Sequence, residues 1–152
     1  NKRIKEIAYE QYMEIQLKPF AKHYLDLLKS HGIPCAVATA TYRDMADSVL
    51  KKLGVFENFK CVLTCEEIGK PKTYPDIFLK AAERLGTAPE DTAVFEDALH
   101  CIETAKSAGF CTVGVFDAMA SEDWDEITQI CDRTVRSFEE LLSAETGMHT
   151  HC

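Results

Sequence analysis

Residues 94–110 read VFEDALHCIETAKSAGF, and this stretch does most to decide the fold. Its first apolar residues, with Ala93, predict a short buried strand over 93–95. Two acidic residues, Glu96 and Asp97, follow at once, and the segment after them predicts a helix over 98–108 that Gly109 ends. The apolar run 111–116 predicts the next strand. The stretch is therefore a strand–helix–strand unit with two carboxylates after its first strand.

The same alternation of element types extends in both directions from this unit. Further strands are predicted at 35–38, 61–63 and 134–135. Helices are predicted at 2–15, 20–31, 42–53, 75–85, 124–130 and 138–142. Because these strands lack a polar face, the pattern indicates an α/β fold with a mostly parallel sheet that helices cover on both sides.

Composition restricts the class of protein. The 152 residues are enough for one domain, and their 46% hydrophobic and 28% charged content is typical of a globular protein. The formal net charge of −8 argues against a nucleic-acid partner, and no apolar run approaches the roughly 20 residues that cross a bilayer. The seven cysteines are odd in number and form no CxxC motif, which favours reduced, buried thiols and a cytoplasmic location.

Polar residues follow the predicted strands at the edge where parallel sheets bind ligands, beyond the carboxyl ends of the strands. The first strand is followed by Thr39, Ala40 and Thr41, the second by Thr64, Glu66, Glu67, Lys70 and Lys72, the third by Glu96 and Asp97, and the fourth by Asp117. A hydroxyl, a lysine and an acidic pair on one edge fit phosphoryl transfer. The hydroxyl can bond phosphate oxygens, the lysine can offset charge, and the carboxylates can hold Mg²⁺.

Each of these residue types also has a purely structural interpretation. Thr39 or Thr41 could cap the helix that follows, and a lysine after a strand is most often solvated. Asp97 could cap the helix that begins at residue 98. Without further context these alternatives stay open.

Three motifs together resemble the haloacid dehalogenase superfamily. They are VATAT at 37–41, KTYPDIFLKAAERLG at 72–86 and VFEDALHCIETAKSAGF at 94–110, in this order and spacing. The branch that contains phosphoglycolate phosphatases and β-phosphoglucomutases is the most similar, and the resemblance covers Leu17 to Leu142. It implies a Rossmann-like core and Mg²⁺-dependent hydrolysis of a small phosphorylated metabolite through an aspartyl-phosphate.

The resemblance also implies roles for particular residues. Thr39, with Ala40 after it, matches the second motif, which binds the phosphoryl group. Lys72 matches the lysine of the third motif because it stands three residues before Pro75, while Lys70 is the alternative in its Gly-Lys-Pro string. Glu96 and Asp97 match the acidic pair of the fourth motif that helps to hold magnesium, with Asp97 favoured as the direct ligand.

The first motif of that superfamily, an Asp-x-Asp segment whose first aspartate attacks phosphorus, does not precede Thr39. The one Asp-x-Asp string, at 123–125, is interpreted as the start of a helix. We therefore expect an N-terminally truncated chain, which lacks the first, central strand between 35–38 and 93–95 and most of the helical cap. Its expected parts are a remnant cap helix at 1–16, a partial core at 17–145 and a flexible tail at 146–152.

The expected consequence is that the 152 residues alone are inactive as a phosphatase, although the family is enzymatic. Two alternatives stay open. The chain could be a catalytically inactive fragment or a binding or regulatory module, or it could derive from a sugar phosphomutase of the same fold.

Overall fold

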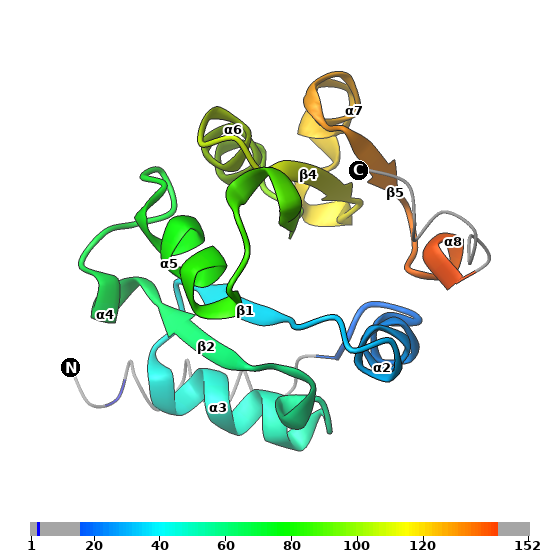
Figure 1. Cartoon of the computed structure of the whole chain (residues 1–152). Helices are drawn as coiled ribbons and strands as arrows, with labels where there is room; N and C mark the ends of the chain where they lie inside the picture. Colours follow the sequence, from blue (N-terminus) through cyan, green and yellow to red (C-terminus); the bar gives the residue numbers. More distant parts are fainter. Residues whose placement is uncertain (1–2, 4–15, 143–152) are drawn as a thin grey trace.

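A computed structural model of the chain describes residue 3 and residues 16–142 (Figure 1). The strands are β1 (Ala36–Thr39), β2 (Cys61–Thr64), β3 (Ala93–Glu96), β4 (Cys111–Val115) and β5 (Arg133–Val135). The helices are α2 (Ala21–Ser30), α3 (Arg43–Lys52), α4 (Cys65–Ile68), α5 (Asp76–Leu85), α6 (Leu99–Ser107), α7 (Trp124–Ile130) and α8 (Glu139–Leu142). The expected cap helix at 1–16, apart from residues 3 and 16, and the expected tail lie outside the described residues, and residue 16 is not helical.

The predicted elements within 16–142 are all present, and their ends differ from the predicted ones by at most one residue. The short helix α4 was not predicted. It forms because Thr64, at the end of β2, caps it by accepting a hydrogen bond from the backbone N–H of Glu67, and Gly69 ends it at φ 82°.

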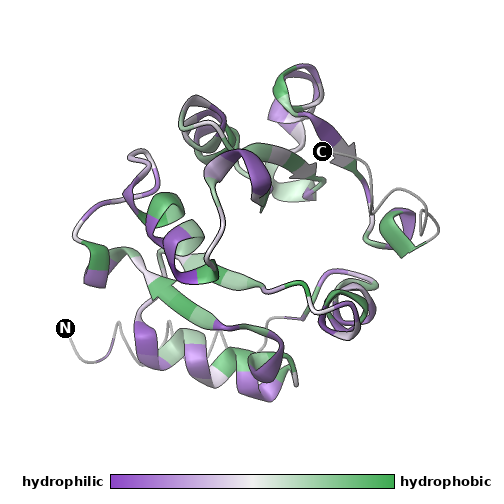
Figure 2. Cartoon of the chain, in the orientation of Figure 1, coloured by the Kyte–Doolittle hydropathy of each residue, from purple (hydrophilic) through white to green (hydrophobic). Residues whose placement is uncertain are grey.

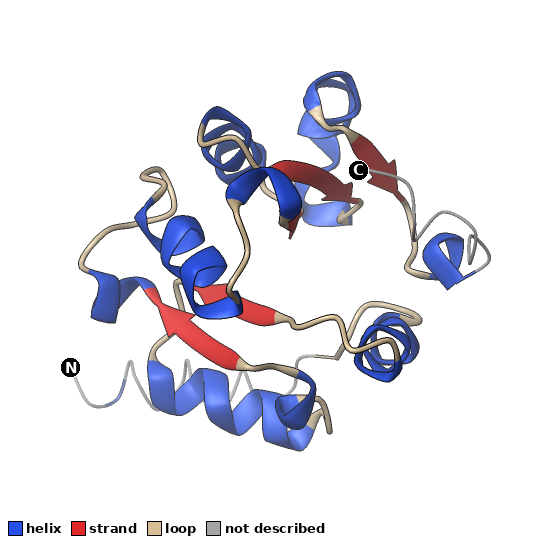
Figure 3. Ribbon diagram, viewed as in Figure 1, coloured by secondary structure: helices blue, strands red, loops and turns tan. Residues whose placement is uncertain are grey.

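All strand pairs are parallel, which confirms the α/β class. The described strands form two sheets, one in the order β1-β2 and one in the order β3-β4-β5. Figure 3 shows the two sheets in red with helices around both. The expectation that 93–95 forms a fully buried strand was wrong, since Ala93 and Phe95 are exposed. Their exposure has a simple cause, because among the described strands β3 pairs with β4 alone and so forms an edge of its sheet.

Helices cover both sheets and join them. α3 and α5 lie on opposite faces of β1-β2, whose strands are coloured hydrophobic in Figure 2. One buried cluster combines β2, α5 and α6, and it consists of Leu63, Ile77, Phe78, Ala82, Cys101, Ala105 and Phe110. A second combines α2, β4, β5 and α8, and it consists of Tyr24, Leu28, Val113, Val115, Val135 and Leu141. The first cluster ties the two sheets together, in part through the edge-to-face contact of Phe78 on α5 with Phe110 just before β4.

The cysteines depart in one place from the expectation of wholly reduced thiols. Cys35, Cys61, Cys65, Cys101 and Cys131 are free thiols, as expected. Cys111 is disulfide-bonded, so the expectation was wrong for this residue. Within the described ranges, no helix is both long and apolar enough to cross a membrane.

Candidate functional site

The carboxyl ends of the strands bring the candidate residues to one edge of the molecule. Thr39 ends β1 and lies in register with Thr64 at the end of β2, while Glu96 ends β3 in register with Gly114. Asp97 follows Glu96 directly, and Asp117 follows β4 by two residues. The predicted edge therefore exists, and it extends across both sheets.

Lys72 follows β2 in the first sheet, and its side chain reaches the end of β3 in the second sheet. Its Nζ lies 2.6 Å from Oε1 of Glu96, in an ion pair whose side chains are 19% and 8% exposed. The other carboxylate oxygen of Glu96 accepts a 3.2 Å hydrogen bond from the backbone N–H of Asp97. Both oxygens of Glu96 are thus engaged, and this carboxylate holds Lys72 at the end of β3.

The alternative lysine lies elsewhere. Lys70 is exposed, and its Nζ lies 4.5 Å from the ring centroid of Tyr74, over the ring face. Glu67 is likewise occupied, because it pairs with Arg43 through bonds of 2.8 and 2.7 Å. Of the two candidate lysines, Lys72 is therefore the one in contact with the acidic pair.

Asp97 belongs to a second charged group on the same edge. The Nζ of Lys18 lies 3.9 Å from its carboxylate and 2.7 Å from that of Asp117. Burial and the negative charge of Glu96 raise the pKa of Asp97, and Lys18 offsets part of that increase. The hydrogen bond from Lys18 lowers the pKa of Asp117, and the backbone N–H of Met119, at 2.8 Å, adds to this effect.

Lys18 is a site residue that the sequence motifs did not reveal. It stands just before Pro19, far from Asp97 in the chain and outside every motif, so only the folded structure brings it to this edge. Asp117 was identified only as a polar residue after a strand. Lys18 bridges Asp117 to Asp97, and a direct hydrogen bond between the two carboxyl groups also raises the pKa of Asp97 and lowers that of Asp117.

Thr39 lies at the end of β1 with its side chain partly buried. Its Oγ1 accepts a 3.0 Å hydrogen bond from the backbone N–H of Thr41. A hydroxyl that accepts this bond can still donate its own proton to an anion. Ala40, between them, is exposed. This turn therefore presents a hydroxyl and backbone at the position predicted for a phosphate.

The structure also decides the capping alternatives. Helix α3 has Tyr42 at its N-cap and α6 has Ala98, and neither forms a side-chain cap hydrogen bond. Thr39 and Asp97 consequently do not cap these helices. The Asp-x-Asp string does lie at a helix start, as predicted, since Asp123 is the N-cap of α7 and Asp125 lies in its first turn.

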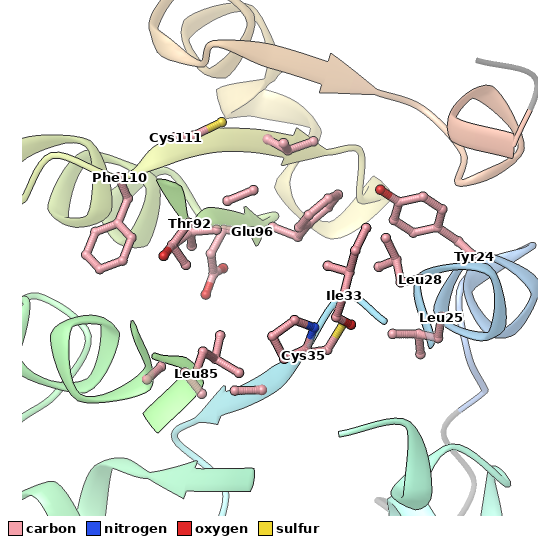
Figure 4. Close-up of a pocket in the computed structure, with 18 of the residues that line it drawn as sticks. Tyr24, Leu25, Leu28, Ile33, Cys35, Leu85, Thr92, Glu96, Phe110 and Cys111 are labelled. Atoms are coloured by element: carbon pink, nitrogen blue, oxygen red, sulfur yellow. The ribbon is translucent and has the colours of Figure 1, made fainter. Parts of the chain in front are cut away.

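A large, mainly apolar groove of about 870 Å³ separates the two sheets (Figure 4). The facing edges of β1 and β3 line it, through Ala36 and Ala38 on one side and residues 93–96 on the other. Figure 4 shows the carboxylate of Glu96 pointing from β3 into this space. Among the described residues each of these strands pairs on one side only, so their second edges both face the groove.

The residues present fit a magnesium ion in part. Within the described ranges no cluster of three or more His, Cys, Asp and Glu side chains could hold a metal ion. Mg²⁺, however, is usually held by one or two carboxylates, with waters and substrate phosphate as its other ligands. Asp97 is suited to such a site because its side chain is 42% exposed, whereas Glu96 already binds Lys72.

Comparisons with known proteins agree with this geometry. Residues 3–109 match the haloacid dehalogenase-like hydrolase family. The chain is 35% identical to a β-phosphoglucomutase of Bacillus subtilis over 99 residues, which are 65% of the chain and 43% of that protein. It is 34% identical to a phosphoglycolate phosphatase of Neisseria meningitidis over 115 residues, 72% of the chain and 49% of that protein.

Solved structures resemble the fold over nearly its whole length. A haloacid dehalogenase hydrolase of family IA, variant 3, from Entamoeba histolytica superposes with a TM-score of 0.78 at 27% identity. The superposition covers 91% of this chain and 64% of that one. In each of these three comparisons the chain spans less than two thirds of its relative.

Proposed function

This chain belongs to the haloacid dehalogenase-like hydrolases, and we propose that it carries most of the site of a magnesium-dependent phosphohydrolase. The proposed reaction is hydrolysis of a small phosphomonoester through an aspartyl-phosphate. The observation that carries the proposal is the 2.6 Å ion pair between Lys72 and Glu96, because it holds a cation beside Asp97 at the carboxyl edge.

The proposed roles follow from position and charge. Thr39 donates its hydroxyl proton to a phosphate oxygen, and the exposed backbone at Ala40 contributes a further contact. Lys72 neutralises negative charge on the transferring phosphoryl group. Glu96 orients Lys72 rather than acting on the substrate, since both of its oxygens are already engaged.

Asp97 is the residue of this chain that we expect to hold Mg²⁺. Its partly exposed carboxylate offers the hard oxygen ligand that this ion prefers. The bound ion would supply Lewis-acid polarisation of the phosphoryl oxygens. The negative charges of Glu96 and Asp117 near Asp97 support a cation-binding role, because like charges beside a carboxylate favour a bound counterion.

The nucleophile in this proposal is the first aspartate of an Asp-x-Asp motif. Residues 1–38 contain no such motif. The groove between β1 and β3 suggests where it would enter. Strands pair at a spacing of about 4.8 Å, and the facing edges of β1 and β3 both offer backbone groups with which an added strand could pair. A parallel strand there would end at the same carboxyl edge as β1 and β3, the edge that carries Thr39 and Glu96 and where an attacking carboxylate would meet the bound phosphate.

A sugar phosphomutase is the second candidate, and the similarity to the β-phosphoglucomutase favours it specifically. The two functions share Thr39, Lys72 and Asp97 and differ in the acceptor of the phosphoryl group, which is water or a sugar hydroxyl. Incubation with a sugar phosphate would distinguish them, because a mutase yields an isomeric sugar phosphate and a phosphatase yields inorganic phosphate.

The coding sequence upstream of Asn1 provides the first test. An in-frame strand that ends in Asp-x-Asp supports the enzyme, whereas a nearby start codon without such a segment supports a binding or regulatory module.

The second test is turnover of p-nitrophenyl phosphate by the chain extended with that segment. We expect Lys72→Met and Asp97→Asn each to lower kcat/KM by about 100-fold or more, the usual cost of removing one group that stabilises a transition state. Lys80→Met serves as the matched control, because Lys80 pairs with the exposed Glu83 on α5, away from the carboxyl edge. Full activity of the Lys72 or Asp97 variant would contradict the proposal.

A further inference from the structure

The segment before α2 places a lysine in the charged group around the proposed metal ligand. The Nζ of Lys18 donates to Oδ2 of Asp117 at 2.7 Å and to the backbone carbonyl of Phe116 at 3.3 Å. It lies 3.9 Å from Oδ2 of Asp97. Lys18 therefore connects the ends of β3 and β4 from a third part of the chain.

The three side chains have comparable access to solvent, with exposed fractions of 35% for Lys18, 42% for Asp97 and 28% for Asp117. An ion bound by Asp97 would lie close to the ammonium group of Lys18, because that group is 3.9 Å from the Asp97 carboxylate. Because its bond to Asp117 is the shorter one, Lys18 can remain paired with Asp117 when the carboxylate of Asp97 binds a metal ion. With Lys18 in place, the three charges leave a single net negative charge.

We propose that Lys18 is a positioning residue that acts as a tethered cation opposite Asp97, and that Asp117 holds it there, so that the pair sets the affinity of this edge for divalent metal. The inference rests on the proposed function, because it takes Asp97 as the metal ligand. It assigns to Lys18 and Asp117 a role that none of the sequence motifs contains.

The two residues should act in opposite directions. Without Lys18, both aspartates face an incoming divalent cation unopposed, and binding should strengthen. Without the charge of Asp117, Lys18 is released to pair with Asp97, and binding should weaken. Unit charges a few ångströms from a divalent ion, in a solvent-exposed and salt-screened setting, change affinity by about fivefold.

Mn²⁺ binding, followed by the loss of the EPR signal of the free ion, measures this directly in the purified chain. We expect Lys18→Gln to bind Mn²⁺ about fivefold more tightly than the parent and Asp117→Asn about fivefold more weakly. The double variant restores the parental net charge and should lie within about twofold of the parent. Lys22→Gln is the matched control, because Lys22 pairs with Asp26 on the exposed surface of α2.

The outcomes separate this inference from the proposed function. Binding that Asp97→Asn abolishes but Lys18→Gln leaves unchanged or weakens would refute the role of Lys18 alone. Binding that survives in Asp97→Asn, or that no variant shows, would refute both. Circular dichroism on each variant confirms that a change in affinity occurs in a folded chain.

Discussion

Replacing Lys72 by methionine isolates the ion pair on which the proposed site depends. Methionine keeps the apolar stem, which lies near the buried Phe78, with the ammonium group 6.0 Å from the ring centroid. The change removes the ammonium group, and with it the ion pair to Glu96 and the more distant contact with the Phe78 ring. Because the Glu96 side chain is 8% exposed, its carboxylate would be left nearly buried without its cation.

The expected loss of stability can be bounded from this geometry. Breaking a fully buried pair typically costs 3–5 kcal/mol, but Lys72 is 19% exposed and Glu96 keeps its bond from the backbone N–H of Asp97. We therefore expect a decrease of about 2 kcal/mol in the free energy of unfolding. For a chain of this size the melting temperature should fall by roughly 4–8 °C.

Urea and thermal denaturation of four chains provide the assay: the parent, Lys72→Met, Glu96→Gln and the double variant. Removing both charges should recover about half of the loss, because no unpaired carboxylate remains. The control, Lys80→Met, should change the free energy by less than about 0.5 kcal/mol, since it breaks an exposed pair. A Lys72→Met chain as stable as the control would refute the account of this pair.

Three further predictions concern the stability contributed by other residues. Gly114→Ala should cost about 1–3 kcal/mol in urea denaturation, because the added Cβ would lie 2.6 Å from Cγ2 of the buried Ile127; a loss under 0.5 kcal/mol would show that the site relaxes freely. Although burial alone would raise the pKa of Asp132, bonds of 2.8 and 3.0 Å from Thr112 lower it below 3.8. Its stabilisation is therefore complete above that pH and lost as pH falls through the lowered pKa, so Asp132→Asn should melt below the parent at pH 7 and converge with it near pH 2; a constant difference would contradict this. Burial raises the pKa of Asp97, so its contribution is lost as pH rises, and Asp97→Asn should melt above the parent at pH 7 and equal it near pH 3. A lower melting temperature at pH 7 would count against that sign.

The elements were predictable because their boundaries are encoded locally. Helix α5 lies between Pro75 and Gly86, and proline is enriched at the start of helices as glycine is just past their end. Strands β3 and β4 are short apolar runs on either side of a helix that ends before Gly109. Helix α4 was missed because it is four residues long and depends on one capping hydrogen bond from the backbone N–H of Glu67 to Thr64.

Residue type and motif spacing predicted roles only for those site residues that belong to a motif. The motif placed Lys72 ahead of Lys70, and the structure puts Lys72 against Glu96. No local pattern indicates that Lys18 will meet Asp97, because that contact depends on how the segment before α2 crosses the ends of β3 and β4. The exposure of β3 depends in the same way on its neighbours in the sheet rather than on its own residues.

The most direct test of the central claim is complementation of the purified 152-residue chain. Hydrolysis of p-nitrophenyl phosphate with Mg²⁺ is measured with and without a synthetic apolar peptide that ends in Asp-x-Asp-x-Thr. The account predicts negligible turnover by the chain alone and turnover with the peptide that Lys72→Met and Asp97→Asn abolish. Robust magnesium-dependent turnover by the chain without any added segment would contradict it.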